Sequence, residues 1–172
     1  MFTSFTPTFT FCEQFNKRAA AEIKRWSLNS EGYILNIPNE STGTTGKKKA
    51  SELYVTFSAP SDSLFTGETF TLRIRFTTKY PFEPPEVQFL VNDVTKAPEH
   101  PHVYTNGHVC LSILTPSAWS PALTVESTVL SIASLLSSCT ERGVPEGNDS
   151  YVARVGTRTP LLTRWAFHDD TV

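Results

Sequence analysis

The chain has no long apolar run and no large excess of charge of either sign. None of its hydrophobic stretches approaches the roughly 18 consecutive residues that a membrane-spanning helix needs. Its 15 basic and 17 acidic residues give a formal net charge of -2, so no bulk charge draws the chain to nucleic acid or to an anionic membrane. We therefore expect neither nucleic acid nor a membrane among its partners.

Cysteine is also scarce. Cys12, Cys110 and Cys139 form an odd and widely spaced set, which argues against a disulfide framework and indicates a reducing compartment. The stretch 1–11 has no basic segment and no small-residue cleavage site. We therefore expect no signal peptide, and a cytoplasmic or nuclear location.

Composition and hydrophobic periodicity predict the fold class. A length of 172 residues with 39% hydrophobic content predicts one globular domain over 15–172, preceded by a flexible tail at 1–14. Helical spacing predicts a helix over about 16–28, with Asn16 as its N-cap. Four runs then alternate with a period of two, which predicts an antiparallel meander. Their apolar residues are Tyr33, Leu35 and Ile37, then Leu53, Val55 and Phe57, then Phe70, Leu72, Ile74 and Phe76, and last Val87, Phe89 and Val91.

A loop and further helices complete the pattern. The segment 38–50 is rich in Gly, Thr and Lys, which predicts a long mobile loop. Apolar residues on one face predict a helix over about 124–138, with Thr124 as its N-cap. Asn148 and Thr159-Pro160 mark the starts of two short helices. The order of elements predicts an α+β domain.

Cys110 is the most informative residue of the chain. It follows a His-Pro-His corner at 100–102 and precedes a Trp-Ser-Pro-Ala segment at 119–122. The thiolate is the reactive form of cysteine, and no acidic side chain adjoins it in the sequence. That pattern favours a nucleophile that carries an acyl group over a hydrolase. A buried structural thiol is the alternative, and it is the role we assign to Cys12 and Cys139.

Taken in order, the motifs resemble those of the ubiquitin-conjugating enzymes over residues 16–168. The matching features are a basic N-terminal helix, a four-strand meander, Tyr80-Pro81-Phe82-Glu83-Pro84-Pro85, His100-Pro101-His102, Cys110, Trp119-Ser120-Pro121-Ala122 and a long apolar helix. The resemblance implies the α+β ubiquitin-conjugating fold. It also implies an enzyme that accepts ubiquitin from an activating enzyme as a thioester on Cys110, without a cofactor.

Two positions depart from the common family pattern. His102 stands where most members have Asn, and Ser112 stands where well-known members have Asp. With the ending at 165–170, they resemble the W-type members, which transfer ubiquitin to protein N-terminal α-amino groups. A lysine-directed enzyme and a ubiquitin-like modifier remain alternatives, whereas Cys110 argues against a non-catalytic scaffold.

The missing acid is consistent with an α-amine acceptor. A lysine has a pKa of about 10.4 and an α-amine one of about 7.7–8.0. That gap makes the neutral α-amine roughly 3.4 kcal/mol easier to reach. The loop 138–143 offers only Glu141 as an acid, beside Arg142. Proteins with flexible N-termini are therefore the predicted substrates.

The histidines near Cys110 receive different predictions. His102 is the second candidate catalytic residue, since an imidazole can donate to the thioester oxyanion or accept the proton of an amine. The alternative is that it only braces the loop. His100 is expected to pack the corner, and His108 to face solvent. The spacing fits no common zinc pattern, so no metal is expected.

Partner surfaces are predicted from the resemblance. It implies that RING or U-box ligases bind Phe82, Pro121 and Ala122, and that the activating enzyme uses Lys17 and Arg18. The alternative for Phe82 is burial in the core.

The C-terminal region is predicted to be loosely held. Residues 141–159 are polar and contain glycine, which indicates weak anchoring. A mobile tail over the thiol cleft would admit a flexible substrate N-terminus. The alternative is ordinary packing of Trp165 and Phe167.

Overall fold

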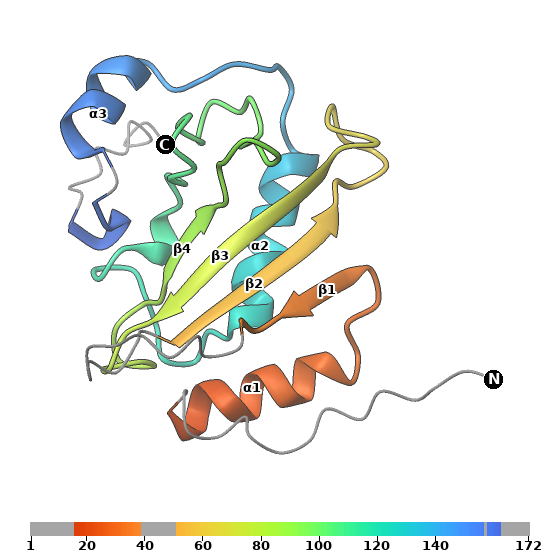
Figure 1. Cartoon of the computed structure of the whole chain (residues 1–172), viewed down its shortest axis with the longest axis vertical. Coiled ribbons are helices and arrows are strands. Elements are labelled where there is room, and N and C mark those ends of the chain that lie inside the picture. The colour runs from red at the N-terminus through yellow and green to blue at the C-terminus, as the bar shows by residue number, and fades with distance from the viewer. Residues whose placement is uncertain (1–15, 39–50, 157, 163–172) are drawn as a thin grey trace.

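The computed structural model describes residues 16–38, 51–156 and 158–162. Its centre is a 4-stranded antiparallel sheet in the order β1-β2-β3-β4, flanked by helices as Figure 1 shows. α2 crosses one face of the sheet, α1 lies beside β1, and α3 lies on the other side of the molecule from α1 (Figure 1). The predicted α+β fold is confirmed.

The elements follow the predicted order. They are α1 (Lys17–Ser27), β1 (Tyr33–Asn36), β2 (Ser51–Ser58), β3 (Thr69–Phe76), β4 (Glu86–Phe89), the 3-10 helix η1 (Ser112–Leu114), α2 (Val125–Ser137), α3 (Asn148–Val155) and the 3-10 helix η2 (Pro160–Leu162). The predicted fourth strand is too long by two residues, because β4 ends at Phe89 and the side chain of Val91 is exposed.

Both predicted N-caps are present. The Asn16 side chain accepts a hydrogen bond from the backbone N–H of Ala19 at 2.9 Å. Thr124 and Ser127 exchange side-chain to backbone hydrogen bonds at 3.1 and 2.9 Å, which makes a capping box. Each bond satisfies an N–H that the first helical turn leaves without a partner.

The core lies between the sheet and α2. Antiparallel register places Leu53 opposite Ile74 and Val55 opposite Leu72, and all four side chains are buried. The alternation predicted from the sequence therefore produces one apolar face. On the other face Arg75 bridges Glu52 at 2.8 Å and Glu86 at 3.4 Å.

Several predictions lie outside the described residues. They concern the tail at 1–14, the loop from residue 39 to 50, and the ending at 165–170. Among the helices that the structure describes, none has the length and apolarity needed to cross a membrane.

Candidate active site

Cys110 lies in a short antiparallel pairing that runs from residue 102 to residue 110. Val103 and Val109 form an antiparallel bridge. It is flanked by hydrogen bonds from Cys110 N to His102 O at 2.8 Å and from Tyr104 N to His108 O at 2.9 Å. Both valines are buried in the core.

Strand geometry then places four functional side chains together. Successive side chains on a strand point to opposite faces, so the side opposite the valines belongs to His102, Tyr104, His108 and Cys110. We call this side the thiol face. In the pairing, His102 is directly opposite Cys110 and Tyr104 is directly opposite His108, which leaves Tyr104 as the diagonal neighbour of Cys110.

Gly107 joins this pairing to the end of β4 in the sheet. Its carbonyl accepts a hydrogen bond from Phe89 N at 2.8 Å, at the end of β4. Its φ of 89° is in the left-handed region, and a Cβ here would lie 2.1 Å from the Phe89 carbonyl oxygen. Only glycine allows so close an approach of the two backbones.

The thiol of Cys110 is half-buried. Within the described residues, neither Cys110 nor Cys139 forms a disulfide. The pKa of Tyr104 is raised, first by burial and then by the nearby charge of the Cys110 thiolate, and Arg154 partly offsets this. Ser112, where family members often carry an acid, is exposed at the start of η1.

His100 holds the corner in front of the thiol, as expected. It is buried, and its Nδ1 accepts a hydrogen bond from the backbone N–H of His102 at 2.9 Å. The proton therefore resides on Nε2, which donates to Leu135 O in α2 at 3.2 Å. Burial lowers the pKa of His100, which favours this neutral form.

The prediction that His108 faces solvent is wrong. Only 2% of its surface is exposed, and its Nδ1 lies 2.8 Å from the hydroxyl of Tyr151 in α3. The prediction that residues 141–159 are weakly anchored is wrong for α3, which lies within that range. Asn148 Oδ1 accepts from Thr105 N at 3.0 Å, and Tyr151 stacks on Tyr104 at 3.9 Å between ring centroids.

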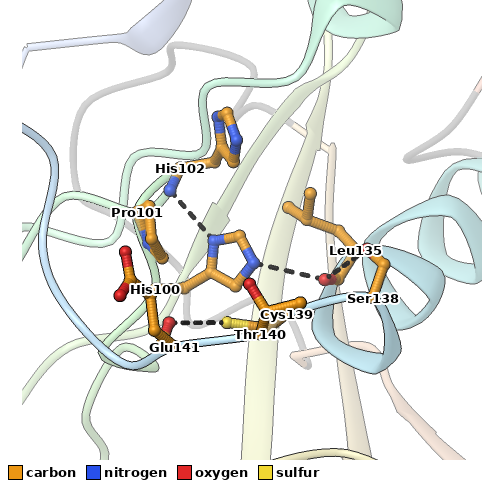
Figure 2. A pocket seen from close by; sticks show the side chains of 8 residues that line it. All are labelled: His100, Pro101, His102, Leu135, Ser138, Cys139, Thr140 and Glu141. Carbon is orange, nitrogen blue, oxygen red and sulfur yellow. Dashed lines mark hydrogen bonds between the residues drawn. The ribbon is translucent and has the colours of Figure 1, made fainter.

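A pocket of about 190 Å³ lies between the His-Pro-His corner and the end of α2. Figure 2 shows its lining, which consists of His100, Pro101, His102, Leu135, Ser138, Cys139, Thr140 and Glu141. The Cys139 thiol donates to the Glu141 carbonyl at 3.0 Å. Across residues 16–38, 51–156 and 158–162, no group of three or more His, Cys, Asp or Glu side chains is placed to hold a metal ion.

The predicted ligase surface is exposed. Phe82 has 81% of its surface accessible, so its burial in the core is excluded, and Pro121 and Ala122 are exposed as well. Trp119 joins the two loops, because its Nε1 donates to Pro81 O at 2.7 Å. This bond fixes the Phe82 loop against the loop that carries Pro121.

Arg18 has a different environment from Lys17. Lys17 is exposed, whereas the Arg18 guanidinium forms an ion pair with Glu22 and donates to Pro121 O at 3.0 Å. Arg18 thus ties α1 to the loop at 121. Whether either residue contacts an activating enzyme stays a prediction.

Sequence reasoning missed Glu22. This carboxylate is 6% exposed and accepts hydrogen bonds from the Tyr80 hydroxyl at 2.7 Å and from Val125 N at 3.0 Å. It therefore joins α1, the loop at residue 80 and the first turn of α2. The available signal was an acid on the apolar side of α1, next to Ile23 and three residues from Ala19.

Comparison with known proteins now decides the family. A family model described as "Ubiquitin-conjugating enzyme" matches residues 18–153. The chain belongs to the ubiquitin-conjugating enzyme family. As a member it is a transferase of the ubiquitination pathway, in which such enzymes work with ubiquitin, an activating enzyme and ligases.

Individual relatives support a W-type member. The chain is 51% identical over 110 residues to "Probable ubiquitin-conjugating enzyme E2 W" of Dictyostelium discoideum, which covers 64% of this chain and 70% of the relative. It is also 49% identical over 157 residues to "Ubiquitin-conjugating enzyme 15" of Arabidopsis thaliana. That alignment covers 90% of this chain and 89% of the relative.

A solved structure supports the same fold. The ubiquitin-conjugating enzyme E2 UbcA1 from Agrocybe aegerita superimposes with a TM-score of 0.69 at 38% identity, over 84% of this chain and 96% of that one. In the present chain, the thiol face and the pocket at the His-Pro-His corner both lie within residues 18–153, which the family model matches.

Proposed function

We propose that this enzyme carries ubiquitin as a thioester on Cys110 and transfers it preferentially to the α-amino group of flexible protein N-termini. The observation that carries the proposal is the thiol face. There Cys110 is the half-buried thiol directly opposite His102, and the pairing orients it away from the core.

The surroundings of Cys110 suit a carrier. A strong base beside the thiol would speed acylation, but it would also activate water against the thioester. Burial lowers the pKa of His100, its Nδ1 lone pair already accepts the His102 N–H, and its Nε2 is paired with Leu135 O, so it has no free lone pair with which to act as that base. Ser112 supplies no carboxylate.

The pocket beside the corner supports an amine acceptor of low pKa. Its described lining contains one carboxyl group, that of Glu141. Reaching the neutral amine costs roughly 3.4 kcal/mol more for a lysine than for an α-amine. A site with little acidic assistance therefore favours the α-amine.

His102 is proposed to act on the transferring group. It is exposed, lines the pocket, and lies directly opposite Cys110 in the pairing. Its imidazole would donate a hydrogen bond to the thioester oxyanion or accept the proton of the amine. Comparing His102→Asn with His102→Ala separates these roles, because Asn can donate but does not act as the base.

Ligase binding is proposed at Phe82, Pro121 and Ala122. An exposed aromatic ring beside an apolar loop is the kind of anchor that dominates small interfaces. Lys17, and Arg18 through its hold on the Pro121 loop, are proposed to serve the activating enzyme. RING or U-box ligases are the expected partners at the Phe82 surface.

The decisive experiment measures discharge from the charged protein. The enzyme is charged with activating enzyme, ATP and labelled ubiquitin, and charging is then stopped. Two disordered peptides of matched composition follow, one with a free N-terminus and no lysine, the other N-acetylated with one lysine. We expect rapid transfer to the first and little to the second.

Variants at the two described thiols complete the design. Cys110→Ala should form no adduct, whereas Cys139→Ala should charge as the wild type does, with an adduct that thiol reductants cleave. A full-strength adduct on Cys110→Ala would refute the thioester assignment. Equal discharge onto the acetylated lysine peptide would leave an ordinary lysine-directed enzyme.

A further inference from the structure

Tyr151 of α3 contacts two of the four residues on the thiol face. Its ring stacks on Tyr104 with centroids 3.9 Å apart and planes 30° apart. Its ring also meets the His108 ring at 5.8 Å in an edge arrangement. Its hydroxyl is 2.8 Å from His108 Nδ1. Tyr151 therefore covers the half of the thiol face that Tyr104 and His108 form.

The hydrogen bond to His108 fixes the direction of the Tyr151 ring. Burial lowers the pKa of His108 and favours its neutral form, and the backbone of Arg158 partly offsets this. A neutral imidazole has one N–H and one lone pair, and a tyrosine hydroxyl can donate or accept. The pair can therefore form with either tautomer of His108.

The start of α3 is pinned independently of Tyr151. Asn148 accepts from Thr105 N at 3.0 Å and donates to the Thr105 hydroxyl at 3.1 Å. Asn106 donates to Gly156 O, after the end of α3, at 3.4 Å. Both ends of the helix are therefore bonded to the turn that follows Tyr104, so the Tyr151 ring has a fixed place.

Tyr104 is the residue through which this packing reaches the thiol. It is the diagonal neighbour of Cys110 in the pairing, and the charge of the Cys110 thiolate acts on its hydroxyl. Its ring stacks on Tyr151, and its place in the pairing is next to His102 and Cys110 on the thiol face. A ring there borders the space that an acyl group on Cys110 and its attacking nucleophile must share.

We infer that Tyr151 is a positioning residue for transfer from Cys110. It acts by stacking on Tyr104 and thereby holding that ring as the wall between the thioester and water. The inference rests on the proposed thioester at Cys110 and adds α3 to the machinery of transfer.

The reaction defines what such a wall changes. In transfer, the amine nitrogen bonds to the thioester carbon, the carbon–sulfur bond breaks, sulfur leaves as thiolate, and the amine gives up a proton. In hydrolysis, water replaces the amine and ubiquitin is released as the acid. A displaced Tyr104 admits more water and orients the amine less well, so the ratio of transfer to hydrolysis falls.

The test measures that ratio on molecules that are already charged. Unfolded protein does not charge, so a merely structural loss lowers the yield and leaves the ratio unchanged. Tyr151→Leu removes the stack and should lower the ratio at least about fivefold, because small displacements at a reacting centre cost up to about a hundredfold. Tyr151→Phe keeps the ring and should stay within about twofold of the wild type.

Two further variants make the test specific. Tyr33→Leu removes a tyrosine ring from β1, at the opposite edge of the sheet from β4. The Tyr33 ring centroid lies 5.6 Å from that of Trp26 and 5.8 Å from that of Phe57. This variant should leave the ratio of transfer to hydrolysis unchanged. Tyr104→Leu should lower the ratio by itself. Adding Tyr151→Leu to it should cause no further fall, because the two residues act through one contact.

Each contrary result has a definite meaning. A wild-type ratio in Tyr104→Leu overturns the inference even if Tyr151→Leu does not fold. So does a Tyr151→Phe variant as impaired as Tyr151→Leu, or a double variant whose losses add. If the wild type forms no reducible adduct at Cys110, the proposed function fails first and takes the inference with it.

Discussion

Replacing Gly107 by alanine tests how the Cys110 segment is seated on the sheet. A non-glycine residue in the left-handed region costs about 1–2 kcal/mol, and Gly107 has a φ of 89°. The new Cβ would also lie 2.1 Å from the Phe89 carbonyl oxygen. The backbones must then separate and break the 2.8 Å hydrogen bond between Phe89 N and Gly107 O, which adds about 1–3 kcal/mol.

The expected loss in the free energy of unfolding for Gly107→Ala is therefore about 2–5 kcal/mol. Gly67→Ala is the matched control, because Gly67 has a φ of 85° with nothing within 4 Å of its Cβ position. It should cost only the conformational part, about 1–2 kcal/mol. Urea unfolding followed by circular dichroism measures both variants. Equal losses would refute the close-approach argument, and so would wild-type charging by Gly107→Ala.

Three further outcomes are expected. Tyr80→Phe removes the 2.7 Å hydrogen bond to the buried Glu22 and should lower the free energy of unfolding by about 1–3 kcal/mol in urea titrations; an unchanged midpoint would contradict this. Phe82→Ala should alter stability by less than about 0.5 kcal/mol, because the ring is 81% exposed. It should charge normally and lose ligase-stimulated discharge, and normal stimulation would place the ligase elsewhere. Burial lowers the pKa values of His100 and His108, so the unfolded chain binds more protons below its own histidine pKa of about 6.5. Stability should be full above that pH and fall below it, and urea midpoints that stay level from pH 7.5 to 5 would disprove the buried neutral rings.

The sequence predicted the elements that have a local cause. Alternation in the strands and the capping side chains of Asn16 and Thr124 are properties of short segments, and all of them are present. The exposed Phe82 also followed from a local motif. The end of β4 was missed by two residues, because the close approach of Gly107 to Phe89 is made by a distant segment.

The site was predicted less completely, for a related reason. The burial of His108 depends on Tyr151, which is 43 residues away in the sequence. Nothing in the polar stretch around Tyr151 indicates that its helix packs on the thiol face. The role of Glu22 likewise depends on Tyr80 and Val125, at separations of 58 and 103 residues.

The direction of the Cys110 thiol is a matter of parity. Val109 is buried and Leu111 packs against the core, whereas Cys110 is half-buried and Ser112 is exposed. Odd positions of this stretch thus belong to the core and even positions to the surface. A cysteine moved by one residue in either direction would take its sulfur into the core. From Cys110, the two-residue step to Ser112 keeps a nucleophile on the accessible side, whereas the two-residue step back reaches the buried His108.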